Sequence, residues 1–154
     1  MLMLGINYAG SCQTLLVPLK EWVKKLDNPS DIENKGVEEI SKLIFSKDTA
    51  TAKLLLAELN KEGAAAGPYF KTRLLWLQAR LEPKLRYPDG VAEVSMLLEK
   101  AMKEAYKTGD DYLIANISWD YGAIMYGYQQ IELAATYCLK AVELQEGPFQ
   151  IKIH

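Results

Sequence analysis

The side chains that could perform acid–base or metal chemistry are few, and their spacing does not bring them together. The chain contains one histidine, His154, which excludes multi-histidine metal sites. The pairs Glu38-Glu39 and Asp110-Asp111 are adjacent in sequence, so their side chains would point in different directions on a helix. We expect them on solvated faces or near helix starts, not across a cleft as in a glycosidase. The sequence also contains no phosphate loop, nucleophile elbow or dinucleotide-binding turn, and so favours a non-enzyme without metal or cofactor.

Composition and charge narrow the class of protein further. Of the 154 residues, 49% are hydrophobic and 25% are charged, which is typical of one globular domain with its own core. The net charge of −2 gives no general attraction to nucleic acid or anionic lipid. After the first 14 residues, no apolar run approaches the roughly 20 residues that a membrane span needs. Cys12 and Cys138 fit no metal-ligand spacing, and we favour a free, buried Cys138 over a disulfide.

The first 26 residues differ from the rest of the chain. Residues 1–14 are apolar, carry no charge and end in small residues. They fit either a signal-peptide remnant without its basic start or an N-terminal arm that packs on the first helices. A signal-peptide remnant would imply an exported or periplasmic protein, whereas an N-terminal arm would imply a cytoplasmic one. Residues 15–26 predict a short basic amphipathic helix, which could bind a membrane surface or a partner but more simply caps one end of a helical array.

Apolar residues at helical spacing predict the helices that must carry any site. The expected ranges are 31–45, 49–62, 68–82, 89–107, 112–128 and 130–145. Asp48 and Asp110 or Asp111 are expected to cap helix starts, because their carboxylates can accept from free backbone N–H groups. Expected helix ends are marked by Gly63, Pro83 and Gly109. Pairs of apolar residues seven positions apart occur in the expected helices 49–62, 89–107 and 130–145, at intervals of about 40 residues. This spacing indicates three similar helical hairpins.

The stretch Ala115–Pro148 resembles a tetratricopeptide (TPR) repeat, a helix-turn-helix unit. The matching positions of the family pattern are Gly122, Ala134, Ala141 and Pro148. The sequence departs from that pattern at Ser118, where the family usually has Trp, and at Cys138, where it usually has an aromatic residue. The resemblance implies an all-α fold, a right-handed superhelical array of about three TPR-like helical hairpins over residues 15–148. Residues 149–154 would then be a tail or the start of a further repeat.

In arrays of this kind the first helices of successive hairpins line a concave face. Aligning Ala79 with Gly122 predicts six residues for a partner-binding surface on that face: Arg73, Trp76, Arg80, Asn116, Trp119 and Tyr126. Aromatic and arginine side chains contribute large interface energies, and arginine can also hold a peptide carboxylate. The set does not reproduce the lysine and asparagine clamp that some family members use for C-terminal carboxylates. The alternative is that the tryptophans pack between helices and that Arg73 and Arg80 are solvated.

The resemblance implies a non-catalytic protein–protein interaction scaffold that binds a peptide or protein partner. One alternative is the sensor or input region of a bacterial histidine kinase or transcription regulator. Another is a small helical ligand carrier or enzyme, which would require a polar-lined pocket. An uncapped last helix would expose apolar surface, so a homodimer through that end is a further expectation.

Overall fold

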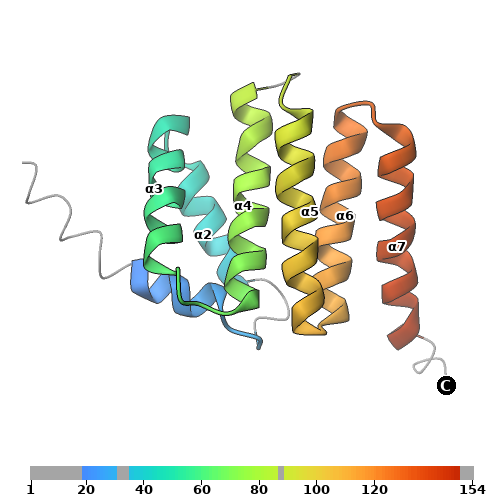
Figure 1. Ribbon diagram of the computed structural model, residues 1–154, viewed down its shortest axis with the longest axis horizontal. Helices are drawn as coiled ribbons and strands as arrows, with labels where there is room; N and C mark the ends of the chain where they lie inside the picture. Colours follow the sequence, from blue (N-terminus) through green and yellow to red (C-terminus); the bar gives the residue numbers. More distant parts are fainter. Residues whose placement is uncertain (1–18, 31–34, 87–88, 150–154) are drawn as a thin grey trace, which may run out of the picture.

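The structure, a computed structural model, describes residues 19–30, 35–86 and 89–149, and all regular elements in these ranges are α-helices (Figure 1). A short helical segment covers 19–26. The longer helices are α2 Lys35–Phe45, α3 Thr49–Glu62, α4 Pro68–Arg86, α5 Val91–Thr108, α6 Asp111–Gly127 and α7 Ile131–Phe149. The all-α prediction is confirmed. The interpretation of residues 1–14 and of the last five residues lies outside the described ranges.

The helices stand side by side in a row from α3 to α7, with α2 packed against α3 and α4 (Figure 1). The most extensive contacts join α4 to α5 and α6 to α7, as expected for helical hairpins. One apolar core runs through the row, from Leu19 and Leu26 near its beginning to Ala134 on α7. No described helix combines the length and the apolar character that crossing a bilayer requires.

The α6–α7 contact depends on small residues, as the sequence predicted. A Cβ added at Gly122 would lie 2.9 Å from the backbone oxygen of Ala134 and would also overlap the sulfur of Cys138. Beside this contact the rings of Tyr121 and Tyr137 stack with centroids 3.8 Å apart. Cys138 is a free thiol. The absence of a side chain at Gly122 therefore allows the two helix backbones to approach closely.

The predicted helix boundaries are partly confirmed. Asp48 and Asp110 are N-caps, and each accepts a hydrogen bond of 3.0 Å from the backbone N–H three residues later. Gly109 ends α5 in the left-handed conformation, with φ of 66°. The prediction that Pro83 ends its helix is wrong, because α4 continues to Arg86. Proline removes one backbone hydrogen bond, but the remaining bonds and the packing of α4 on α5 keep the helix intact.

Candidate functional site

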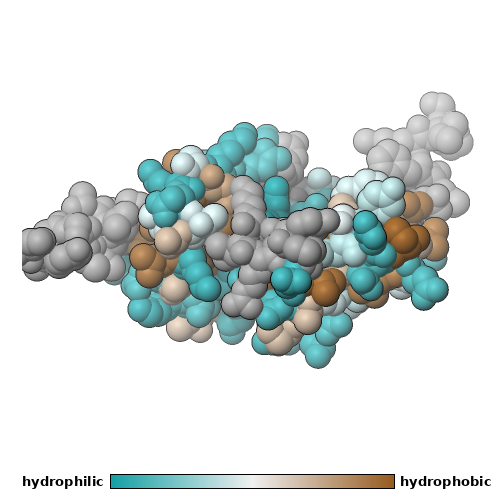
Figure 2. Space-filling model, turned by 90° about the horizontal axis from the view of Figure 1, so that it is seen from above, coloured by the Kyte–Doolittle hydropathy of each residue, from teal (hydrophilic) through white to brown (hydrophobic). Residues whose placement is uncertain are grey.

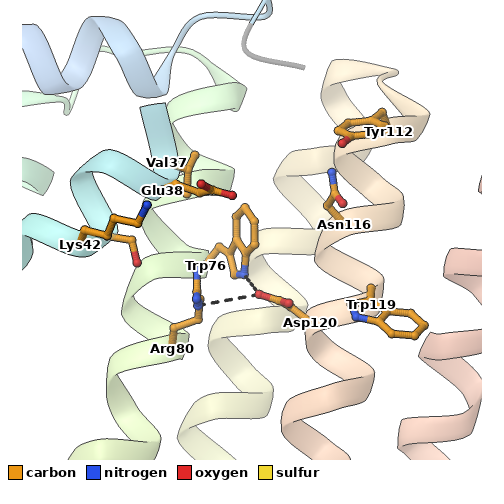
Figure 3. A pocket seen from close by; sticks show the side chains of 10 residues that line it. Val37, Glu38, Lys42, Trp76, Arg80, Tyr112, Asn116, Trp119 and Asp120 are labelled. Atoms are coloured by element: carbon orange, nitrogen blue, oxygen red, sulfur yellow. Dashed lines mark hydrogen bonds and ion pairs between the residues drawn. The ribbon is translucent and has the colours of Figure 1, made fainter. Parts of the chain in front are cut away.

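A pocket opens on the side of the array where α2, α4 and α6 meet (Figure 3). Its volume is about 540 Å³. These three helices are the first members of the three predicted hairpins, so alternate helices of the chain share one lining. The side chains come from α4 as a floor and from α2 and α6 as two walls.

The floor is formed by Trp76, whose side chain is 6% exposed. Its indole Nε1 donates a hydrogen bond to Asp120 Oδ2 on α6, at 2.5 Å. Arg80, one turn further along α4, holds its guanidinium 5.8 Å from the centre of the Trp76 ring and its Nε 3.9 Å from the same carboxylate oxygen. A cation near an aromatic face is attracted by the ring quadrupole. The three side chains thus form one polar junction between α4 and α6 at the base of the pocket.

The charge of Asp120 is costly in this position. Burial raises the pKa of the Asp120 carboxyl above its usual value, while the hydrogen bond from Trp76 and the charge of Arg80 act in the opposite direction. Burial is the largest of these effects, so the carboxylate is only partly compensated. Its second oxygen, Oδ1, has no partner among the described residues and remains an acceptor at the pocket.

The α6 wall presents Tyr112, Asn116 and Trp119, which are spaced by four and three residues and share one side of the helix. Tyr112 and Trp119 are exposed aromatic residues, and Trp119 keeps 55% of its surface accessible. The Nδ2 atom of Asn116 is buried and has no hydrogen-bond partner in the described part of the chain. A buried donor without a partner costs free energy, so this amide is poised to receive an acceptor from a bound molecule.

The α2 wall contributes charges of both signs. Glu38 and Lys42 lie one turn apart, and both side chains are exposed at the pocket. Together with Asp120 and Arg80 they give the lining two acidic and two basic groups, with no net charge. A lining that is electrically balanced and partly aromatic suits a polar, uncharged segment of a bound molecule better than a free anion or a metal ion.

Four of the six predicted binding residues line this pocket, namely Trp76, Arg80, Asn116 and Trp119. Tyr126 lies on the same side of α6, two turns beyond Trp119, and is 68% exposed but outside the lining. The alternative that tryptophan packs between helices holds in part, because Trp76 is buried and lines the pocket at the same time.

The prediction for Arg73 is wrong, whether as a binding residue or as a solvated one. Its side chain is 1% exposed. Its Nη1 donates to the backbone oxygens of Leu26 and Asn28, both at 2.8 Å, and its guanidinium lies 5.3 Å from the Tyr69 ring centre. Through these two hydrogen bonds, Arg73 connects the segment 19–30 to α4. That segment covers the start of α4, which periodicity within α4 could not indicate.

Sequence reasoning missed Asp120, Tyr112 and the α2 wall. Asp120 did carry a signal, because it is the single charged residue between Tyr112 and Ile131. A lone acid in the interior of a helix that is uncharged beyond its first residue needs a polar partner. The sequence predicts a solvated carboxylate at Glu38, and its exposure agrees with that, but the packing of α2 on α4 also places it at the pocket.

The fold and the site define a helical array with one mixed polar and aromatic pocket on the face made by α2, α4 and α6. No protein family, curated protein or solved structure matches the chain.

Proposed function

We propose that this protein is a non-catalytic interaction scaffold, a TPR-like array in which α2–α3, α4–α5 and α6–α7 are the hairpins. The pocket over α4 holds a peptide segment of a partner protein. Two features support the array: alternate helices contribute to one pocket, and small residues at Gly122 and Ala134 bring the last hairpin together. The superhelical curvature and the repeat assignment belong to this proposal.

The observation that carries the proposal is the Asn116 amide between two exposed aromatic side chains. A peptide offers a carbonyl acceptor at each residue, which can satisfy the buried Nδ2 donor. Its N–H groups can donate to the free oxygen of Asp120, while Tyr112 and Trp119 cover a side chain at low entropic cost. The pocket thus provides a donor, an acceptor and apolar walls, which together match an extended peptide.

A small-molecule carrier fits the same pocket less well. Its volume of about 540 Å³ lies in the range of ligand sites, which run from about 300 to 1,000 Å³. Such sites usually bury most of their ligand, whereas Tyr112 and Trp119 are exposed here. An open lining between helices favours a chain that enters and leaves the pocket.

Selection from a random peptide library tests the proposal. The purified protein is expected to enrich peptides that bind with micromolar affinity, and Asn116→Leu and Trp119→Ala should each weaken their binding by about tenfold. Leu54→Ala is the matched control, because Leu54 is 68% exposed on α3, away from the pocket. Circular dichroism verifies that each variant is folded. Selected peptides that bind the Asn116 and Trp119 variants as tightly as the wild type would show that the pocket is not the binding site.

A further inference from the structure

A second surface, on the last two helices, exposes apolar side chains that the pocket does not use. On α7, Ile131, Leu139 and Val142 are exposed, with 63% of Leu139 accessible. Ala135 falls between them, so these residues form one stripe along the helix. On α6, Trp119 and Tyr126 lie two turns apart and are also exposed. Figure 2 shows apolar side chains gathered at the end of the array where α7 lies.

The two stripes lie on the same side of the α6–α7 hairpin. Helix α5 occupies the opposite flank, where the Lys140 ammonium lies 4.6 Å from the ring centre of Tyr106 and the hydroxyl of Tyr121 contacts that of Ser95 at 2.6 Å. The helical spacing turns the α7 stripe away from Lys140 and the α6 stripe away from Tyr121. The stripes therefore adjoin on the flank that α5 leaves open.

The size of this surface suits a helix. The α7 stripe runs over the twelve residues from Ile131 to Val142, and the eleven steps between them span about 16 Å at 1.5 Å per residue. Two neighbouring helices form a groove between their side-chain ridges, and a third helix can pack into it at about 8–10 Å from each. Contiguous apolar surface of this kind on a folded protein marks an interaction site.

The charges around this surface indicate which kind of partner it can bind. Along α6 and α7, from Asp111 to Gln145, the acidic residues are Asp111, Asp120, Glu132 and Glu143, and Lys140 is the one basic residue. Lys140 faces Tyr106 on the α5 flank, while Glu132 and Glu143 are exposed next to Ile131 and Val142. A second copy would bring acidic edges together, and an anionic membrane would be repelled. A basic partner is favoured by the same charges.

We propose that the face formed by Trp119, Tyr126, Ile131, Leu139 and Val142, here called the α6–α7 apolar face, binds an amphipathic helix of a partner protein. The apolar stripe of that helix lies on Leu139 and its neighbours. Lysine or arginine residues at the edges of the stripe pair with Glu132 and Glu143. This surface lies beside the pocket and shares Trp119 with it, but the inference rests on α7 and stands without the peptide site.

The test uses a labelled model peptide of about 18 residues, built from leucine and lysine as an amphipathic helix. Fluorescence anisotropy at physiological salt compares it with a scrambled peptide of equal composition and with a leucine–glutamate counterpart. The full chain should bind the basic amphipathic peptide about tenfold more tightly than either control. Leu139→Gln should weaken this binding about tenfold, and Leu54→Gln, at an equally exposed leucine of α3, should leave it unchanged. Equal binding of the scrambled peptide, or no effect of Leu139→Gln, would overturn the proposal.

Two further measurements separate this surface from its competitors. Asn116→Leu should not change binding of the basic peptide, and Leu139→Gln should not change binding of peptides selected by the pocket. Light scattering should find a monomer at all concentrations tested. A dimer that Leu139→Gln dissociates would overturn the proposal and assign the face to a second copy of the chain.

Discussion

Asp120 and Asn116 lie one turn apart on α6, and the structure treats the two polar groups differently. The Asp120 carboxylate receives a hydrogen bond from the buried Trp76 indole, whereas the Asn116 Nδ2 donor is buried without a partner. The first residue joins two helices and the second leaves a bond to be made. Asp120 thus contributes to the contact between α4 and α6, whereas the Asn116 amide is available for the proposed peptide.

Substitutions at Asp120 should separate its hydrogen bond from its charge. Asp120→Asn keeps an acceptor for Trp76 and removes the buried charge, so we expect the variant at pH 7 to be at least as stable as the wild type. Asp120→Ala leaves the Trp76 N–H unpaired and should lower the free energy of unfolding by about 1–3 kcal/mol. Urea unfolding curves measure both effects.

The pH dependence of the Asp120→Asn variant gives a second check. Because burial raises the pKa of Asp120 in the folded protein, the folded state holds this proton more tightly than the unfolded chain. The tighter binding of this proton stabilises the folded wild type. This stabilisation is fully present below the unfolded pKa of 3.8 and is lost as the pH rises through the folded pKa of Asp120. The advantage of Asp120→Asn should accordingly shrink as the pH falls towards 3.8. An advantage that grows on acidification would contradict the assigned direction.

Arg73 and Arg80 have equivalent helical positions in the sequence, but their spacing does not predict which of them is buried. They are two turns apart on α4, so the sequence placed both on one surface. The segment 19–30 packs over the first and leaves the second at the pocket. That contact joins residues more than 40 positions apart, and no local pattern in the chain encodes it.

Removing the charge of each arginine should therefore have unequal effects. Arg73→Met keeps an apolar stem but leaves the carbonyls of Leu26 and Asn28 without their donor, and should cost about 2 kcal/mol or more in unfolding free energy. Arg80→Met breaks a partly exposed pair at 3.9 Å and should cost less than about 1 kcal/mol. Urea denaturation measures both values, and limited proteolysis at 27–30 should accelerate in the Arg73 variant alone. Equal costs for the two variants would disprove the anchoring role.

At the scale of the elements, the sequence predicted the helices well because each carries its own apolar stripe and end signals. Asp48, Asp110 and Gly109 act locally, and their effects are visible in a few consecutive residues. Pro83 shows the limit, because α4 continues past it to Arg86 as part of a helix that packs extensively on α5. Proline is locally unfavourable inside a helix, but tertiary context can override this preference.

The close approach of α6 and α7 should make Gly122 sensitive to substitution. Gly122→Ala places a methyl group against Ala134 O and Cys138, so the helices must separate, and we expect a loss of about 1–3 kcal/mol in unfolding free energy. Gly127→Ala is the matched control on the same helix, because a Cβ there meets no atom within 4 Å. It should be neutral or stabilising by up to about 1 kcal/mol. Thermal or urea unfolding of the pair gives the comparison, and equal stability of both variants would refute the close contact.

At the scale of the whole molecule, the pocket depends on how three helices from separate parts of the chain are arranged. Repeat spacing suggested that first helices share a face, and four of the six chosen residues do line one pocket. The depth of the pocket, its α2 wall and its polar junction come from contacts between helices, which spacing alone does not determine. The fold class was thus available from the sequence, whereas the site was available only in part.

Stability should also vary along the array. Helix α2 packs less extensively on its neighbours than α4 to α7 do on theirs. Segments with fewer packed contacts open more readily. Hydrogen exchange should therefore be faster in α2 and α3 than in the cores of α4 to α7. Protection of α2 equal to that of α6 would contradict this gradient.

We propose above that the pocket over α4 receives a peptide backbone through Asn116. The most direct measurement is an NMR titration of the labelled protein with a peptide selected by it, following the side-chain amide signals of Asn116 and the indole signals of Trp76 and Trp119. We expect these signals to shift together and to saturate with the peptide, while signals from α3 and α5 stay in place. Saturable shifts confined to α3 and α5, with the Asn116 amide unchanged, would contradict it.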